Sequence, residues 1–202
     1  GLKILLFNNE IYGLTKGQYS PTSRKGTISP SSPAGSIDTP VSPGQFALGA
    51  GAKFFARAID TDKTGLGDVL QQAHAFDGAS FNEIFQNCIV YNEDVFATFT
   101  DRKNAVETQL HLRHGQPMAF GEDGSKGIRF NPETYSLEII DAAESPGDVL
   151  VHDERNAVLA RLLIDLQLPV ALGVIYRQPA EPFESAFYKH HATRMRRTKS
   201  VA

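Results

Sequence analysis

Strand-like and helix-like segments alternate along the first part of this chain. Apolar, strand-like runs cover residues 2–7, 54–59 and 80–86, and helical patterns cover residues 42–49 and 64–76. This alternation is typical of a parallel sheet with crossover helices, in which buried strands read as continuous apolar runs. The sequence therefore predicts an α/β fold: a doubly wound, mostly parallel sheet with helices on both faces.

The rest of the chain has a different pattern. Alternating apolar residues around an Asn-Pro turn predict a hairpin over residues 127–141. An apolar helix is expected over residues 158–166, then a strand over residues 168–175, whose opening proline indicates a first or edge position. A short helix is expected near residues 95–99 and a last helix over residues 183–191.

The pattern also suggests how the chain is divided. Because a central parallel strand needs neighbours on both sides, the strand-like start indicates that an N-terminal part of the domain is missing. Residues 1–122 are expected to form the C-terminal part of one domain, and residues 123–202 a C-terminal extension with hairpin, helix, strand and basic tail. The basic run at residues 194–199 could dock an acidic partner, although a solvated tail is the favoured interpretation.

Composition excludes several classes of protein. With 202 residues, of which 41% are hydrophobic, the chain can bury a substantial core. Its net charge of −3 gives no reason to expect nucleic acid as a partner. No run approaches the roughly 20 apolar residues of a membrane span. One cysteine excludes an intramolecular disulfide and fits a reducing compartment, so a cytoplasmic protein is expected.

A polar, glycine-bearing segment follows the first strand. Asn8 and Asn9 come directly after it, and Gly13 and Gly17 follow. Ligands of open α/β sheets bind outside the carboxyl ends of strands, and amide and carbonyl oxygens suit magnesium, which bridges phosphates. Residues 19–44, rich in Ser, Pro, Thr and Gly, predict a long loop over this site rather than a linker, and we expect it to be ordered in the assembled protein more than in this chain alone.

The amino-acid sequence of this segment resembles a motif of a known family. Residues 8–18, Asn-Asn-Glu-Ile-Tyr-Gly-Leu-Thr-Lys-Gly-Gln, followed by Ser-Pro-Thr at residues 20–22, resemble the second half of the thiamine diphosphate motif in β subunits of 2-oxoacid:ferredoxin oxidoreductases. The wording is closest to the 2-oxoglutarate type. The likeness weakens after about residue 123, and the stretches that extend it are residues 47–50, 57–60, 83–88 and 114–117.

The resemblance implies particular roles around the first loop. It gives magnesium the side-chain oxygen of Asn9 and the main-chain carbonyl of Ile11. Gly13 would let the backbone approach the cofactor, and Leu14 and Thr15 would lie beside the thiazolium and the phosphates. The family's Gly-Asp-Gly segment, which holds the remaining magnesium ligand, is absent from this sequence.

Other residues have roles that are less clear from the residues themselves. Lys16 and Gln18 are candidate electrostatic or substrate-facing groups. A lone cysteine usually indicates a small buried apolar residue, but the resemblance implies that Cys88 is the fourth thiolate of a 4Fe-4S cluster. His111 and His114 lack the supporting ligands of a metal site, so hydrogen-bonded or solvated histidines are expected.

The resemblance implies a thiamine-diphosphate-binding fold, with residues 1–122 as its C-terminal part. It also implies an enzyme, of which this portion alone is expected to be inactive. The expected reaction is coenzyme A-dependent oxidative decarboxylation of a 2-oxoacid, with 2-oxoglutarate favoured, in a heterodimer with an α subunit that passes electrons to ferredoxin. No independent nucleophile or general base is apparent, which suits chemistry performed by a cofactor. Two alternatives stay open: a non-oxidative thiamine diphosphate enzyme, such as a decarboxylase or synthase, and a non-catalytic binding or assembly module.

Overall fold

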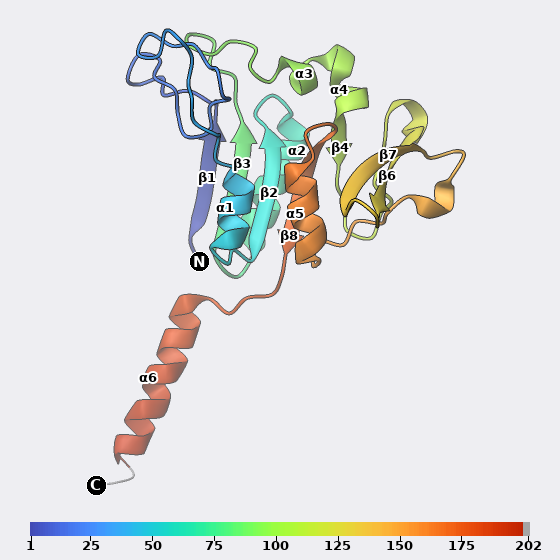
Figure 1. Ribbon diagram of the computed structural model, residues 1–202. Coiled ribbons are helices and arrows are strands. Elements are labelled where there is room, and N and C mark those ends of the chain that lie inside the picture. The colour runs from blue at the N-terminus through green and yellow to red at the C-terminus, as the bar shows by residue number, and fades with distance from the viewer. Residues whose placement is uncertain (200–202) are drawn as a thin grey trace.

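A computed structural model describes the backbone of residues 1–199 and the side chains of residues 1–192. It contains a five-stranded sheet of order β1-β3-β2-β8-β4 and a three-stranded sheet of order β5-β6-β7 (Figure 1). The strands are β1 (Lys3–Asn8), β2 (Phe54–Ile59), β3 (Ser80–Phe85), β4 (Gln109–His111), β5 (Ala119–Phe120), β6 (Lys126–Asn131), β7 (Ser136–Asp141) and β8 (Val170–Arg177). The helices are α1 (Pro43–Gly49), α2 (Lys63–Ala75), α3 (Ala97–Thr100), α4 (Arg102–Thr108), α5 (Ala157–Asp165) and α6 (Phe183–Lys199), with 3-10 turns at Glu122–Gly124 and Pro146–Asp148.

The larger sheet has the predicted α/β architecture. Strands β1, β3 and β2 run parallel, β4 is parallel to β8, and the β2–β8 pairing is antiparallel. Neighbouring residues of β2 alternate between the two faces. Phe55 packs with residues of α1 and α5, whereas Phe54 packs with residues of α2. Helices thus cover both faces of a mostly parallel sheet, as predicted.

Local signals place the first two helices. The Ser42 side chain accepts a hydrogen bond from the backbone N–H of Gln45 at 3.4 Å, and Pro43 occupies the first turn of α1. Asp62 caps α2 in the same way, because its side chain accepts the backbone N–H of Gly65 at 3.0 Å. Capping residues satisfy N–H groups that have no partner inside the helix. The predicted bounds of both helices agree with the structure to within about one residue.

Two strand expectations are wrong. The apolar run at residues 2–7 was expected to be buried, but β1 is an edge strand here, with Leu5 44% and Phe7 52% exposed. The proline before β8 suggested a first or edge position. Pro169 instead precedes the strand, which starts at Val170 and lies inside the sheet between β2 and β4. Proline is compatible with that sheet because it lies outside the hydrogen-bonded part of the strand.

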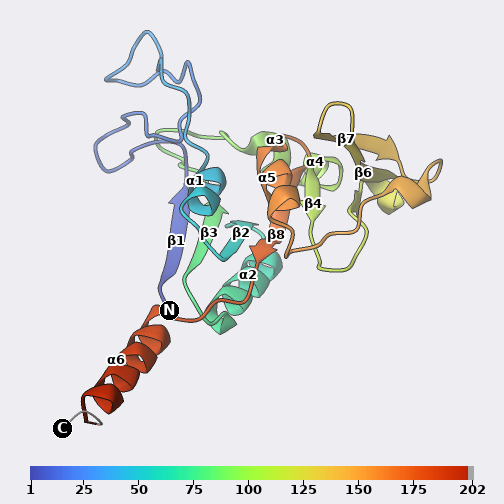
Figure 2. The ribbon, with the colours of Figure 1, turned by 60° about the horizontal axis from the view of Figure 1, so that its bottom comes forward.

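The predicted hairpin is confirmed as β6 and β7, which pair antiparallel. The expected division at residue 122 stays a prediction. β8, which follows that point, pairs with β2 and β4 in the larger sheet. Helix α6 extends away from both sheets (Figures 1 and 2). The basic side chains at residues 194–199 lie outside the described side chains. Across residues 1–199, no helix combines the length and apolar character needed to cross a membrane.

Candidate functional site

The chain leaves β1 through a tight turn at residues 8–11, which two asparagine side chains shape. The amide oxygen of Asn8 accepts the backbone N–H of Glu10 at 3.2 Å, and that of Asn9 accepts the backbone N–H of Ile11 at 3.3 Å. Asparagine favours such turns because its side chain reaches the backbone two residues on. Glu10 takes a left-handed φ of 52°. The amide turn, residues 8–11, therefore has a defined shape at the carboxyl end of β1.

Two oxygens of the amide turn have lone pairs left for a ligand. The amide oxygen of half-buried Asn9 accepts one hydrogen bond, and among the described residues no donor reaches the carbonyl of Ile11. Magnesium prefers oxygen ligands and keeps several waters or phosphate oxygens. These two oxygens therefore fit that ion. The described part of the chain contains no group of three His, Cys, Asp or Glu residues placed to hold a metal ion.

A compact glycine loop, residues 12–18, follows the amide turn. Its ends meet where the N–H of Tyr12 donates to the carbonyl of Gln18 at 2.8 Å, and the N–H of Gly17 donates to the carbonyl of Tyr12 at 3.0 Å. Leu14 at its tip is 99% exposed, and Thr15 is exposed beside it. Leu14 and Thr15 thus project outward, where a bound molecule or another chain can reach them, whereas Ile11 is 4% exposed and Asn9 and Gly13 are half-buried.

Gly17 gives a testable requirement for this loop. Its φ is +85°, and a Cβ there would lie 2.8 Å from Cδ1 of Tyr91. Gly17→Ala should lower the free energy of unfolding by about 1–3 kcal/mol, because it combines backbone strain with a clash. Gly26→Ala is the matched control, since Gly26 has a φ of +89° with nothing within 4 Å of its Cβ position. Urea unfolding of both variants measures the difference, and equal losses would show that the Tyr91 contact is unimportant.

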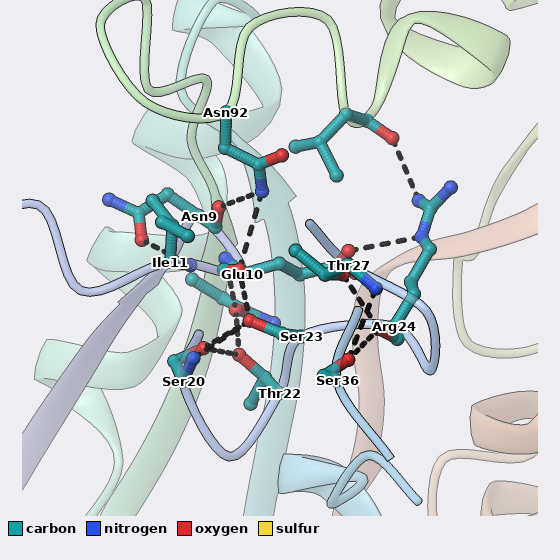
Figure 3. A network of polar contacts seen from close by, with 12 residues as sticks. Asn9, Glu10, Ile11, Ser20, Thr22, Ser23, Arg24, Thr27, Ser36 and Asn92 are labelled. Atoms are coloured by element: carbon teal, nitrogen blue, oxygen red, sulfur yellow. Dashed lines mark hydrogen bonds and ion pairs between the residues drawn. The ribbon is translucent and has the colours of Figure 1, made fainter. Parts of the chain in front are cut away.

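Cys88 lies against the glycine loop. Its Sγ is 3.9 Å from the position that a Cβ would take at Gly13. The Cys88 carbonyl accepts the N–H of Asn92 at 3.0 Å, and the Asn92 side chain donates to the carbonyls of Asn9 at 2.9 Å and Glu10 at 3.3 Å (Figure 3). The segment around Cys88 and the amide turn are therefore joined, although Asn9 and Cys88 are 79 positions apart in the sequence. As the only cysteine of the chain, Cys88 cannot hold a four-thiolate cluster by itself.

The long loop after residue 18 packs onto the amide turn (Figure 3). Residues 19–42 form neither helix nor strand, as their prolines predict. Thr22 Oγ1 donates to the amide oxygen of Asn8 at 2.8 Å, and the Ser23 hydroxyl donates to the carbonyl of Glu10. Arg24 Nη2 donates to the carbonyl of Val95 at 2.8 Å. This loop is ordered by polar contacts on two sides of the site.

A cavity of about 500 Å³ opens next to the amide turn, and Asn8 and Glu10 line it. Its floor holds a buried ion pair, in which Arg57 Nε lies 2.8 Å from Glu83 Oε2. Their side chains are 8% and 2% exposed. Phe85 supplies part of an aromatic wall. Asn8, not Asn9, is thus the asparagine that reaches this cavity.

The carboxyl group of Glu10 is perturbed by its surroundings. Burial raises the pKa of Glu10 from 4.5 to about 7, against the opposing effect of the Arg24 guanidinium. Arg24 Nε lies 3.0 Å from Glu10 Oε2, and the Glu10 side chain is 13% exposed. Nothing in the sequence indicated that the Glu10 carboxyl group would titrate near neutral pH.

This pKa has a consequence for stability. The unfolded chain loses the Glu10 proton near pH 4.5, whereas the folded chain keeps it to about pH 7. The stabilising effect is therefore complete below pH 4.5 and is lost as pH rises through 7, by up to about 3 kcal/mol. Relative to wild type, Glu10→Gln should gain about 2–3 kcal/mol between pH 5 and pH 8, measured by urea unfolding without added metal.

Glu138→Gln provides the control for that measurement. The Arg129 hydrogen bond lowers the pKa of Glu138 below 4.5, so this carboxylate stays ionised at both pH values. Its difference from wild type should stay constant between pH 5 and pH 8. A constant difference for Glu10→Gln as well would contradict the assigned pKa of Glu10.

Sequence reasoning missed several residues of the site. Arg57 and Glu83 carried a readable signal, because each is a charged residue inside an otherwise apolar or buried strand. Arg24 and Asn92 gave none, since single polar residues in loops are common. The two candidate histidines are hydrogen-bonded: His111 Nε2 lies 2.9 Å from the Gln109 side-chain oxygen, and His114 Nδ1 accepts the N–H of Glu154 at 3.3 Å.

Comparisons with known proteins bear on this site. Residues 1–84 match the family described as thiamine pyrophosphate enzyme, C-terminal TPP binding domain. The chain is 44% identical over 151 residues to 2-oxoglutarate oxidoreductase subunit KorB of Mycobacterium tuberculosis, covering 74% of this chain and 40% of that protein. It is 36% identical over 96 residues to the β subunit of 2-oxoacid:ferredoxin oxidoreductase 1 of Aeropyrum pernix, covering 48% of this chain and 30% of that protein.

A solved structure shares the fold. It is the 2-oxoglutarate:ferredoxin oxidoreductase of Magnetococcus marinus with 2-oxoglutarate, coenzyme A and succinyl-CoA bound, and it aligns with a TM-score of 0.69 at 22% identity. The alignment covers 95% of this chain and 52% of that one. The chain thus spans less than half the length of the two sequence relatives and about half of the structural neighbour.

Proposed function

Because this chain belongs to the β subunits of the 2-oxoacid:ferredoxin oxidoreductases, we propose that its amide turn binds the magnesium and diphosphate of thiamine diphosphate. In the complete enzyme, this site would serve the coenzyme A-dependent oxidative decarboxylation of a 2-oxoacid. The observation that carries the proposal is the amide turn itself. It presents the Asn9 amide oxygen and the Ile11 carbonyl, each with a lone pair available, at the carboxyl end of a sheet strand.

Each residue of the site has a role that its position supports. Asn9 and Ile11 would supply magnesium ligands. Gly13, which has no Cβ, would let the backbone approach the cofactor, although a Cβ there would face Tyr91 and Cys88, at 3.8 Å and 3.9 Å. Leu14 and Thr15 stand exposed on the loop that follows, where they can contact the thiazolium and the phosphates. When bound, thiamine diphosphate supplies stabilisation of the carbanion left by decarboxylation. The amide turn and the glycine loop would orient it.

Cys88 favours the oxidative reaction over the non-oxidative alternative. Its thiol lies beside the glycine loop. An iron-sulfur cluster bound there would be close to the proposed thiazolium site and could accept electrons from it. We assign it one thiolate of a 4Fe-4S cluster, with the other thiolates coming from residues outside this sequence. A decarboxylase or synthase needs no such thiolate. Such a cluster would supply electron transfer, with ferredoxin as the proposed acceptor.

The names of the relatives guide the proposals on substrate and partner. KorB of M. tuberculosis is named a 2-oxoglutarate oxidoreductase subunit, so 2-oxoglutarate is the proposed substrate. A β subunit implies an α subunit, so a heterodimer is proposed. Residues 1–122 would belong to the thiamine-diphosphate-binding domain and residues 123–202 to its extension.

The test uses the full-length protein assembled with its partner subunit. Magnesium and thiamine diphosphate are titrated by calorimetry, and reduction of a viologen dye is followed with coenzyme A and either 2-oxoglutarate or pyruvate. Cofactor binding with 2-oxoglutarate-dependent dye reduction supports the proposal. Failure to bind thiamine diphosphate would overturn it. Decarboxylation without dye reduction, and without iron-sulfur absorbance, would instead support the non-oxidative enzyme.

A further inference from the structure

Glu83, on the middle strand β3, contacts side chains of both neighbouring strands, β1 and β2. It is 1% exposed. Its two carboxylate oxygens have different partners: Oε1 accepts the amide Nδ2 of Asn8 at 2.9 Å, and Oε2 accepts Nε of Arg57 at 2.8 Å. Arg57 Nη1 in turn donates to the carbonyl of Ile164 at 3.1 Å. The carboxylate is thus held from the β2 side and directed toward the amide turn.

This contact fixes which way the Asn8 side chain faces. With its nitrogen toward Glu83, its oxygen accepts both the N–H of Glu10 at 3.2 Å and the hydroxyl of Thr22 at 2.8 Å. The reverse orientation would place an amide oxygen against a carboxylate and an amide N–H₂ against the N–H of Glu10. Buried donors and acceptors without partners are costly, so the reverse orientation is excluded.

We propose that Glu83 is a positioning residue for the metal–diphosphate site, acting through Asn8 on the amide turn. The proposal rests on the proposed function and adds to it a residue that contacts neither Asn9 nor Ile11 directly. Without the Asn8 bond to the Glu10 N–H, the turn has no side-chain contact from β1 that sets its left-handed residue. The spacing of the Asn9 and Ile11 oxygens would then depend on the remaining contacts that Asn9, Ser23 and Asn92 make with the turn. Residues that orient metal ligands typically change metal affinity about 10–100-fold when replaced.

Glu83→Gln is the primary test. The substituted amide has one oxygen and one N–H₂ group, but both Asn8 Nδ2 and Arg57 Nε need an acceptor. If the oxygen faces Arg57, the N–H₂ group meets the Asn8 N–H₂ group, and Asn8 must rotate away from the Glu10 N–H. We expect magnesium affinity, measured at saturating thiamine diphosphate in the full-length assembled protein, to fall about 10–100-fold.

A second substitution distinguishes positioning from general damage. In the double variant Asn8→Asp with Glu83→Gln, the new carboxylate at position 8 accepts from the N–H₂ group of the substituted amide, from the Glu10 N–H and from Thr22. The oxygen of the substituted amide still accepts from Arg57, and the net charge is unchanged. Magnesium affinity should return to within about threefold of wild type, because every donor again has an acceptor.

Glu154→Gln is the matched control. Glu154 is also buried and also accepts from an arginine, with Arg177 Nε at 2.8 Å, but it lies away from the cavity at the amide turn. Its magnesium affinity should stay within about threefold of wild type even if its stability falls. An affinity loss in Glu154→Gln equal to that in Glu83→Gln, or a double variant as weak as the single one, would overturn the positioning role.

Hydrogen exchange separates this proposal from the proposed function. The backbone N–H of Glu10 should exchange faster in Glu83→Gln and recover in the double variant, with no cofactor present. If wild type binds no magnesium and thiamine diphosphate, the proposed function fails while the exchange pattern still reports on the turn. Unchanged exchange at Glu10 in Glu83→Gln would reject the positioning role itself.

Discussion

Replacing Asn9 with alanine should weaken magnesium-dependent binding of thiamine diphosphate about 100-fold or more, because it removes a proposed direct ligand of the ion. The same change also removes the Asn9 amide oxygen that accepts the Ile11 N–H at 3.3 Å. The Ile11 carbonyl, the other proposed ligand, would then be held less rigidly. Calorimetric titration of the assembled protein with thiamine diphosphate, at several magnesium concentrations, measures the effect. Asn9→Asp keeps an oxygen at this position and should retain most of the affinity.

Asn131→Ala controls for the loss of a turn-forming asparagine. Its amide oxygen accepts the backbone N–H groups of Glu133 at 2.9 Å and Thr134 at 3.2 Å, in the hairpin between β6 and β7. This variant should bind the cofactor like wild type. Normal cofactor binding by Asn9→Ala would show that Asn9 is not a magnesium ligand, and the proposed function would lose its main support.

Arg57→Met should cause the largest loss of stability, about 3–5 kcal/mol in the free energy of unfolding, because it leaves the buried Glu83 carboxylate without its cation. The Arg57 side chain is 8% exposed and also bonds the carbonyl of Ile164, so solvent cannot replace these contacts easily. Urea unfolding measures the loss.

Two further variants test this explanation. Arg57→Met combined with Glu83→Gln should recover much of the loss, since a neutral amide costs less to bury than an unpaired carboxylate. Arg129→Met breaks two ion pairs, with Glu138 and Asp148, whose three side chains are 32–54% exposed, and should cost no more than about 1 kcal/mol. A double variant as unstable as Arg57→Met would show that the methionine packs badly and that charge is not the cause.

The architecture could be predicted because its signals are local. Apolar runs, helix caps and prolines act within a few residues, and they located α1, α2, β2, β3 and the β6–β7 hairpin. The hydrogen bonds that shape the amide turn reach only two residues along the chain, but the sequence predicted only a polar, glycine-bearing segment after the strand and no turn there.

Long-range placement was less accessible. An apolar run indicates that a strand can be buried, but not that neighbours cover it, and β1 is exposed at the edge of the sheet. The interior position of β8 follows from pairing with β2 and β4, which no local pattern encodes.

By itself, therefore, the sequence determined the strand–helix order and the positions of the first two helices, whereas Asn9 and Ile11 stay candidates that the family resemblance implied. Tertiary structure alone decided that Cys88 lies beside Gly13, and that Glu83 joins Arg57 to Asn8. The physical reason is that hydrogen bonds and burial between distant segments depend on sheet order and register, whereas capping and turn formation depend on neighbours in the chain.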